Sequence, residues 1–217
     1  MRIPLTRYAR RELWQYGATL VVASIVSALY FIYVTPLFVA AFVWLLWFFR
    51  DPVRRVPEGP ALLVAPADGR VTDIDTCDDV RLGGETRRVS IFLSIFDVHL
   101  NRVPCSGRLA STDYRRGKFL NAMKSESART NESNALLIES DEVPGAAVVV
   151  RQVAGVIARR IVCECTPGQV LARGELFGMI KFGSRTDLCV PTEHLAELKV
   201  AVGDHVAAGE TVIGVLK

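Results

Sequence analysis

The hydrophobic pattern divides the chain into two parts. No residue from Leu13 to Phe49 is charged and most are apolar, whereas short apolar runs separated by glycines follow Asp51. The uncharged stretch is too long for one straight span, because as a helix it would measure roughly 55 Å against a hydrocarbon core of about 30 Å. Pro36 lies inside the stretch and removes an amide donor, so the pattern predicts two helices, over 14–34 and 37–49.

Arginines flank both ends of this predicted helical hairpin. Four precede the first helix and three follow the second: Arg2, Arg7, Arg10, Arg11, then Arg50, Arg54 and Arg55. By the positive-inside rule, both flanks lie on one face of a membrane. We therefore expect residues 1–55 to anchor the chain in the cell membrane, with residues 56–217 on the cytoplasmic side. The second helix is short, so a full span and an interfacial wedge both remain open.

Beyond the anchor, the pattern is typical of a mainly β domain. Short runs rich in β-branched and apolar residues alternate with glycine turns, which favours antiparallel strands. The predicted strands cover 69–74, 88–95, 107–112, 135–139, 146–153, 168–180, 188–190 and 200–215. One polar insert, 114–134, has no apolar periodicity and is predicted to be helical or irregular.

An internal echo refines the fold class. The segments "PGQVLARGELFGMI" and "VGDHVAAGETVIGVL" share the same glycine and glutamate spacing about 35 residues apart. Glycine-punctuated hairpins of this kind resemble the two halves of a barrel-sandwich hybrid, the architecture of biotinyl and lipoyl carrier domains. We therefore predict an α+β chain with an antiparallel β domain of this type behind the helical hairpin.

Charge and cysteine content exclude some classes of function. Residues 1–50 hold five arginines and one glutamate, so the rest of the chain is nearly neutral within a net charge of +3, and nothing suggests nucleic acid. The five cysteines are odd in number and lack the C-x-x-C spacing of zinc sites. We expect reduced thiols in a cytoplasmic domain and no metal.

Three residues carry candidate chemistry. His99 follows an apolar strand, Asp68 lies in the turn sequence "APADGRV", and Ser184 follows Gly183 in "GMIKFGSRTD". Taken singly, each is more typical of strand-end or turn structure. Together they supply a base, an acid and a hydroxyl, the set needed to activate a serine nucleophile.

The motifs "APADGRV", "FDVHLNRVPCSG", "YRRGKFLNA" and "GMIKFGSRTD" occur in an order and spacing that resemble phosphatidylserine decarboxylase proenzymes of the short, archaeal-type form. The resemblance covers essentially the whole chain after the anchor. It implies self-cleavage between Gly183 and Ser184, with Ser184 attacking the Gly183 carbonyl and ending as a pyruvoyl group. The products would be a large chain, 1–183, and a small chain, 184–217, held in one heterodimer that could assemble further.

The resemblance also implies residue roles. His99 would be the base, with Asp68 as its orienting carboxylate, and the pyruvoyl carbonyl would form a Schiff base with phosphatidylserine and act as electron sink. The products would be phosphatidylethanolamine and carbon dioxide. Longer members of the family carry a second histidine three residues after the first, where this chain has Arg102. Arg102 is therefore a candidate for binding a carboxylate or phosphate of this anionic phospholipid, as are Arg115, Arg116 and Lys118.

Two other classes of protein stay open at this point. A membrane-tethered carrier domain would be biotinylated or lipoylated at Lys181, within "GMIKFGS". A noncatalytic membrane scaffold would keep an intact, unmodified chain. Cleavage between Gly183 and Ser184 discriminates both from the decarboxylase.

Overall fold

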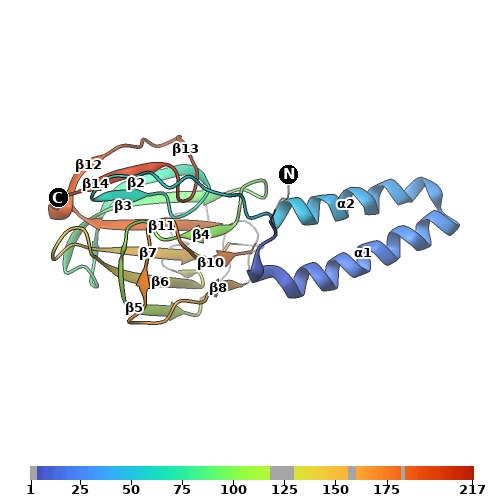
Figure 1. Ribbon diagram of the computed structural model, residues 1–217, viewed down its shortest axis with the longest axis horizontal. Helices are drawn as coiled ribbons and strands as arrows, with labels where there is room; N and C mark the ends of the chain where they lie inside the picture. The colour runs from blue at the N-terminus through green and yellow to red at the C-terminus, as the bar shows by residue number, and fades with distance from the viewer. Residues whose placement is uncertain (1–3, 118–129, 156–159, 182–183) are drawn as a thin grey trace. The chain divides into compact units, whose positions relative to one another are not determined.

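The computed structural model describes residues 4–117, 130–155, 160–181 and 184–217 (Figure 1). Contacts divide the chain into two compact units, Met1–Val53 and Arg54–Lys217. The first is helical and the second is built of β-strands. Each is described separately below.

The helical unit is an antiparallel hairpin closed at its base. A short 3-10 turn, Arg7–Ala9, leads into α1 (Arg10–Tyr30), and a second, Ile32–Val34, leads into α2 (Thr35–Phe48). The amide of Thr6 donates to the carbonyl of Phe49 at 3.0 Å, which brings the start and end of the hairpin together. Pro36 lies in the first turn of α2, where its missing N–H leaves no bond unmade. The break therefore falls at Phe31, earlier than predicted.

The outer surface of the helical unit is apolar. The segment Arg7–Tyr30 is long and apolar enough to cross a membrane by length and composition, and Ile32–Phe48 is a shorter apolar helix. Large side chains such as Trp14 and Leu29 are more than 70% exposed. Such exposure is consistent with membrane association, because apolar side chains of this size are favoured in lipid over water.

The described residues of the β unit form three antiparallel sheets. An eight-stranded sheet has the order β13-β2-β3-β11-β7-β6-β5-β9, and two three-stranded sheets have the orders β1-β14-β12 and β4-β10-β8 (Figure 1). The strand bounds are β1 Leu62–Val64, β2 Gly69–Asp79, β3 Gly84–Leu93, β4 Leu100–Arg102, β5 Gly107–Arg115, β6 Ser133–Ser140, β7 Ala147–Val153, β8 Ile161–Cys163, β9 Val170–Leu171, β10 Leu176–Ile180, β11 Ser184–Pro191, β12 Leu195–Leu198, β13 His205–Val206 and β14 Val212–Leu216.

Strands that lie equally far from the two ends of the large sheet correspond to each other, which reveals an internal twofold repeat. In the large sheet β13 corresponds to β9, β2 to β5, β3 to β6 and β11 to β7; in the small sheets β1, β14 and β12 correspond to β4, β10 and β8. Both halves carry a register irregularity at the same place, after Val71 in β2 and after Leu109 in β5. The β unit is thus two similar halves: one runs continuously from β4 to β10, and the other is formed by β1–β3 together with β11–β14.

The repeat is visible in the sequence once the strands are known. "APADGRV" before and within β2 corresponds to "VPCSGRL" before and within β5. Gly69 and Gly107 occupy the same position, and a Cβ at either would lie 2.1 or 2.0 Å from a carbonyl oxygen of the neighbouring strand. No other residue fits such a close backbone approach, so these two glycines explain the "GR" shared by both motifs.

The pairing registers give the residue equivalences. Arg185 of β11 lies opposite Phe92, and Ala147 of β7 lies opposite Glu139. Phe92 and Glu139 in turn face the equivalent residues Arg70 and Arg108, so Ser184 is equivalent to Ala146. Leu62 in β1 and Leu100 in β4 are likewise equivalent, which makes His99 equivalent to Ala61. Asp68 is equivalent to Ser106.

The predicted fold class is confirmed: the β unit is antiparallel and follows a helical hairpin. The four strands that the pattern missed, β1, β4, β8 and β12, have only three or four residues each. β11 begins at Ser184, four residues earlier than predicted, because its polar residues are buried rather than exposed. Most of the polar insert predicted over 114–134 lies outside the described residues, although its ends belong to β5 and β6.

Candidate active site

Ser184 is the first residue of β11 and is fully buried. Its Oγ has no hydrogen-bond partner in the described part of the chain. Leaving a buried hydroxyl without a partner costs about 1–3 kcal/mol, so such groups are rare; among the described residues, Ser90 Oγ is the other buried hydroxyl without a partner. Gly183, the other half of the predicted cleavage site, lies outside the described residues.

His99 is fully buried in the loop between β3 and β4. Its Nδ1 lies 3.0 Å from the carbonyl oxygen of Asp97. Because a carbonyl oxygen can only accept, Nδ1 carries the proton and Nε2 is left as the basic nitrogen. A tight turn holds this arrangement, in which the Oγ and amide of Ser94 both donate to Asp97 Oδ2, at 2.6 and 2.8 Å.

The backbone ties His99 to the strand that leads to Ser184. The amide of Ile180 donates to the carbonyl of His99 at 3.1 Å, and β10 ends four residues before Ser184. β4 and β10 are also paired directly. The structure therefore brings the segment that holds His99 next to the end of β10.

Asp68 lies in the turn before β2 and makes two kinds of contact. Its Oδ1 accepts the amide of Ala208 at 2.7 Å, and both carboxylate oxygens accept from Arg54, at 2.9 and 2.7 Å. Burial raises the pKa of Asp68 above its usual value, although Arg54 opposes the shift. Among the described hydrogen bonds, those of Asp68 go to Arg54 and Ala208 and not to His99.

The amide contact of Asp68 has a counterpart in the other half. Ser106, the equivalent residue, accepts the amide of Arg173 through its Oγ at 3.2 Å. A polar side chain at this position therefore holds a neighbouring turn in both halves. The carboxylate and its pair with Arg54 are specific to the half that contains Ser184.

The four predicted lipid-binding residues lie in different places. Arg102 ends β4 and donates from Nη1 to the carbonyl of Gly174 at 3.0 Å. Arg115 ends β5, and Arg116 follows it in an exposed position. Lys118 lies outside the described residues. The registers place Arg115 in the cross-strand row of Arg185, on the face of the sheet opposite to the Ser184 side chain.

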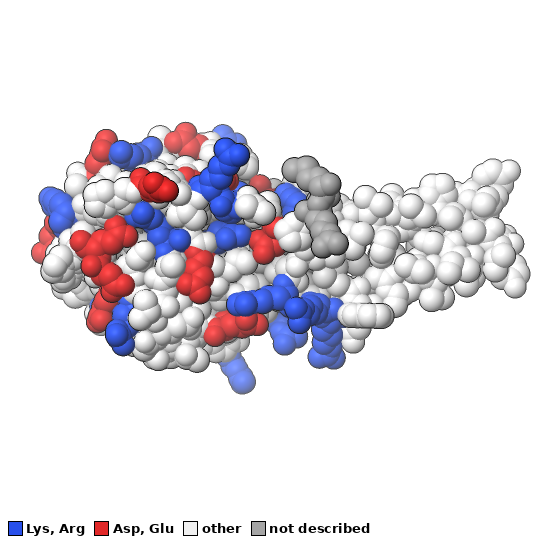
Figure 2. Space-filling view, viewed as in Figure 1, with Lys and Arg blue, Asp and Glu red and all other residues white. Residues whose placement is uncertain are grey.

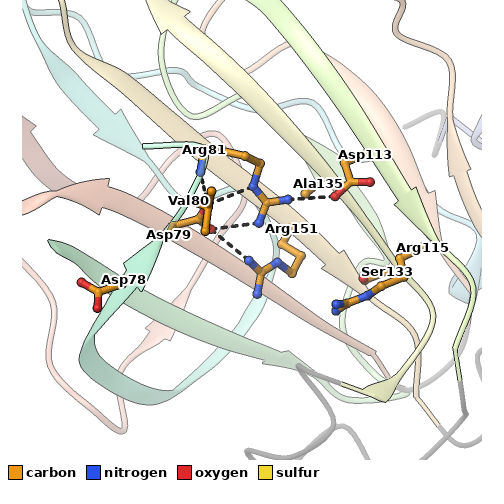
Figure 3. Close-up of a pocket in the computed structure, with 9 residues that line it drawn as sticks. All are labelled: Asp78, Asp79, Val80, Arg81, Asp113, Arg115, Ser133, Ala135 and Arg151. Carbon is orange, nitrogen blue, oxygen red and sulfur yellow. Dashed lines mark hydrogen bonds and ion pairs between the residues drawn. The ribbon is translucent and has the colours of Figure 1, made fainter. Parts of the chain in front are cut away.

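Arg115 lines a pocket of about 460 Å³ on that opposite face (Figure 3). Arg81 and Arg151 converge there on Asp79, at 2.9 and 3.0 Å, and Arg81 also reaches Asp113 at 3.4 Å. Burial raises the pKa of Asp79, but hydrogen bonds from Arg81 outweigh it and keep the pKa below its usual value. Figure 2 shows acidic and basic side chains intermixed over the visible face of the β unit. The pocket thus pairs most of its charges internally.

The sequence patterns did not predict a buried polar network that lies beside Ser184. Asn101 donates through Nδ2 to Thr186 Oγ1 at 3.0 Å and accepts through Oδ1 from Gln152 Nε2 at 2.9 Å. Gln152 Oε1 accepts from Asn134 Nδ2 at 3.2 Å. All four side chains are at most 5% exposed. Thr186 is two residues from Ser184 on β11, so both side chains point to the same face.

The cysteine thiols differ in pKa, and this difference predicts the order in which they are alkylated. Hydrogen bonding from Cys189 lowers the pKa of Cys77 to about 6, and hydrogen bonding from Cys165 lowers that of Cys163 to about 7. Burial raises the pKa of Cys105 to about 12. Because the thiolate is the reactive form, we expect iodoacetamide at pH 7 to alkylate Cys77 and Cys163 well before Cys105. Peptide mapping over time checks the order, and early alkylation of Cys105 would contradict the described burial.

Comparison with known proteins identifies the family. A sequence profile described as phosphatidylserine decarboxylase matches residues 41–214. Proteins named phosphatidylserine decarboxylase proenzyme are similar along most of the chain: that of Carboxydothermus hydrogenoformans is 42% identical over 218 residues and covers 100% of both chains. That of Rhodopirellula baltica is 42% identical over 97% of this chain and 87% of the relative, and that of Magnetococcus marinus 45% over 80% and 78%. The chain therefore belongs to the phosphatidylserine decarboxylase family of carboxy-lyases.

Proposed function

We propose that this decarboxylase makes its own pyruvoyl group from Ser184 by cleaving the chain between Gly183 and Ser184. The observation that carries the proposal is the buried, unpartnered hydroxyl of Ser184 in a half whose counterpart has Ala146 instead. His99 and Asp68 likewise correspond to Ala61 and Ser106. The three positions that hold a nucleophile, a base and an acid around residue 184 are therefore filled by small residues at the symmetry-related place around residue 146.

Cleavage begins with attack by the serine. His99 Nε2 accepts the hydroxyl proton, Ser184 Oγ bonds to the carbonyl carbon of Gly183, and the C–N bond of the peptide breaks as the nitrogen takes up a proton. The result is an ester between Gly183 and the Ser184 side chain, with a free amine on Ser184. Because glycine has no side chain, a nucleophile can approach its carbonyl carbon from either face, which suits glycine to the position before the serine.

Elimination then separates the two chains. Loss of the Ser184 α-proton to a base breaks the Cβ–Oγ bond, so Gly183 leaves as a carboxylate and dehydroalanine remains at position 184. Tautomerisation to an imine and addition of water release ammonia and leave the pyruvoyl group. The electron pairs move within the chain, so no outside oxidant or reductant is required.

The residues around Ser184 fit such a group. Its site is buried, and the contact between His99 Nδ1 and the Asp97 carbonyl holds the imidazole ring. The group supplies an electrophilic carbonyl that takes the substrate amine and receives the electrons released with carbon dioxide. In this proposal His99 holds or returns a proton at the reacting carbon, and burial excludes bulk water from it.

We further propose that the substrate is phosphatidylserine drawn from a membrane to which the helical unit is anchored. The apolar surface of Arg7–Tyr30 supports membrane association. Of the basic residues considered for the lipid phosphate, Arg102 ends β4, the strand that follows His99, whereas Arg115 lies on the opposite face of the large sheet. We propose Arg102 as the phosphate or carboxylate ligand on this ground. Residues 56–217 would work on the cytoplasmic side.

The carrier-domain alternative has little support in the structure. Its modified residue, Lys181, is only 7% exposed, whereas a carrier lysine must present its group to other enzymes. The family assignment also favours the decarboxylase.

Intact-mass spectrometry of freshly purified, denatured protein tests the proposal. We expect two chains meeting between residues 183 and 184, with the small chain lighter by one ammonia than a chain that starts with serine. A single chain of full mass would contradict the proposal, as would a small chain that begins with an unmodified serine. Extra mass on Lys181 would instead restore the carrier alternative.

A further inference from the structure

We infer that Thr186, Asn101 and Gln152 form a positioning network for the group at position 184, and that the fold itself does not require them. The inference rests on the proposed function for the chemistry at Ser184. It draws on two independent observations, the direction of the hydrogen bonds and the internal repeat.

The hydrogen bonds of the network run in one direction. Gln152 Oε1 accepts from Asn134, which leaves its Nε2 to donate to Asn101 Oδ1. Asn101 must then donate through Nδ2, and its acceptor is Thr186 Oγ1 at 3.0 Å. Each amide is fixed in orientation by its neighbour, because an amide oxygen only accepts and an amide nitrogen only donates. The hydroxyl of Thr186 is therefore left as the donor at the end of the chain.

That donor lies on the same face of β11 as Ser184. The two residues are separated by one position, so their side chains emerge about 7 Å apart along the strand. Both are fully buried, and the Ser184 hydroxyl has no partner in the described part of the chain. Asn101 is two residues from His99 and also contacts the carbonyl of Pro66 at 3.4 Å. The network thus links the segments that hold His99, Asp68 and Ser184.

The internal repeat shows what these positions need for packing alone. At the symmetry-related place around residue 146, Thr186 corresponds to Val148, Asn101 to Leu63 and Gln152 to Val190. Those three side chains are at most 3% exposed and belong to the hydrophobic core. Apolar residues therefore satisfy the same backbone geometry. A buried amide network in place of an apolar core is costly unless every group is paired, so its presence beside Ser184, when the symmetry-related place is apolar, points to the reaction.

The role that follows is to fix β11 and the Thr186 hydroxyl relative to the reacting atoms. A displacement of about 1 Å at a reacting group can lower a rate by about 100-fold. Asn101 and Gln152 act through Thr186 and are positioning residues. Their loss should affect both the cleavage step and the later decarboxylation, because both occur at residue 184.

The first test replaces Thr186 in the full chain. We expect Thr186→Val to slow cleavage between 183 and 184 by about 100-fold, measured by intact mass over time after synthesis. Thr186→Ser keeps the donor and should cleave close to the wild-type rate. Equal rates for Thr186→Val and wild type would overturn the inference, as would equal slowing in Thr186→Ser and Thr186→Val, which would indicate packing alone.

The second test replaces the network with the apolar residues of the symmetry-related place around residue 146. The triple variant Asn101→Leu, Gln152→Val, Thr186→Val installs the apolar residues that already pack there. Its thermal unfolding midpoint should be no lower than that of the uncleaved Ser184→Ala variant, while its cleavage is slowed at least as much as in Thr186→Val. Cleavage at the wild-type rate, or unfolding well below Ser184→Ala, would contradict the inference. If the wild type is itself uncleaved, the proposed function fails, and the turnover number of each variant on phosphatidylserine then tests the network separately.

Discussion

A Ser184→Ala variant is expected to remain a single chain of 217 residues and to lose decarboxylation by at least about 1000-fold. Alanine removes the hydroxyl that attacks Gly183 and therefore also the source of the pyruvoyl group. The fold should survive, because the equivalent residue in the other half is already Ala146, which is 2% exposed. Intact mass and the release of carbon dioxide from phosphatidylserine are the two measurements.

The internal repeat provides a matched control for this prediction. Ala146→Ser creates a second Gly-Ser pair at the equivalent place, next to Gly145. We expect no cleavage there, because Ala61 and Ser106 stand where the site around Ser184 has His99 and Asp68. Cleavage at 145/146 would show that the backbone geometry alone suffices and that His99 and Asp68 are dispensable. Full activity in Ser184→Ala would overturn the proposed mechanism.

An Asp68→Ser variant is expected to fold normally yet cleave at least about 100-fold more slowly than the wild type. Serine is the residue at the equivalent position, where Ser106 Oγ accepts a backbone amide at 3.2 Å. The substitution therefore keeps a partner for the amide of Ala208 and removes the carboxylate and its pair with Arg54. Cleavage followed by intact mass separates the two functions of Asp68.

The control is Ser106→Ala at the symmetry-related position. It removes the same kind of turn contact, which costs about 1 kcal/mol of unfolding free energy, and leaves Ser184, His99 and Asp68 unchanged. Cleavage should proceed at the wild-type rate. If Ser106→Ala slows cleavage as much as Asp68→Ser does, the effect of Asp68 is structural and the carboxylate has no part in the reaction.

Asp68 also makes the unfolding free energy depend on pH, in a direction that its pKa shift defines. Burial raises its pKa in the folded protein above the usual 3.8, so the folded state favours the protonated acid. The stabilisation from protonation is complete below the unfolded pKa and is lost as pH rises through the folded pKa. We expect the unfolding free energy of uncleaved Ser184→Ala to fall over that window relative to the Ser184→Ala, Asp68→Asn variant. Denaturant unfolding at several pH values checks the sign, and a difference that rises with pH would contradict it.

Local sequence was sufficient for the elements with strong signals. The uncharged run before Arg50 predicted the helical hairpin, and alternation with glycine turns predicted the longer antiparallel strands. The strands β1, β4, β8 and β12 were missed because three or four residues are too few to show a period. The start of β11 was missed because Ser184, Thr186 and Asp187 read as a polar turn, whereas the tertiary structure buries all three.

The candidate site was only partly accessible from the sequence. Ser184, His99 and Asp68 were chosen from a resemblance, and nothing in their spacing showed that Asp68 pairs with Arg54. The network of Asn101 and Thr186 joins residues 85 positions apart, which no local pattern reveals. Comparing the two halves residue by residue would have found it, but the equivalence becomes visible only when the strand pairing is known.

The central place of β11 has a consequence for the life of the protein. The strand pairs along its length with β3 and β7, and its first residue is where the chain is proposed to break. Folding of the precursor is unimolecular, but after the break a 34-residue piece, 184–217, would have to find its partner again from solution. The mature protein would then have a fold that its two separated chains do not readily regain. Thermal unfolding would be irreversible, and the lifetime of the folded protein would be set by the unfolding rate rather than by an equilibrium.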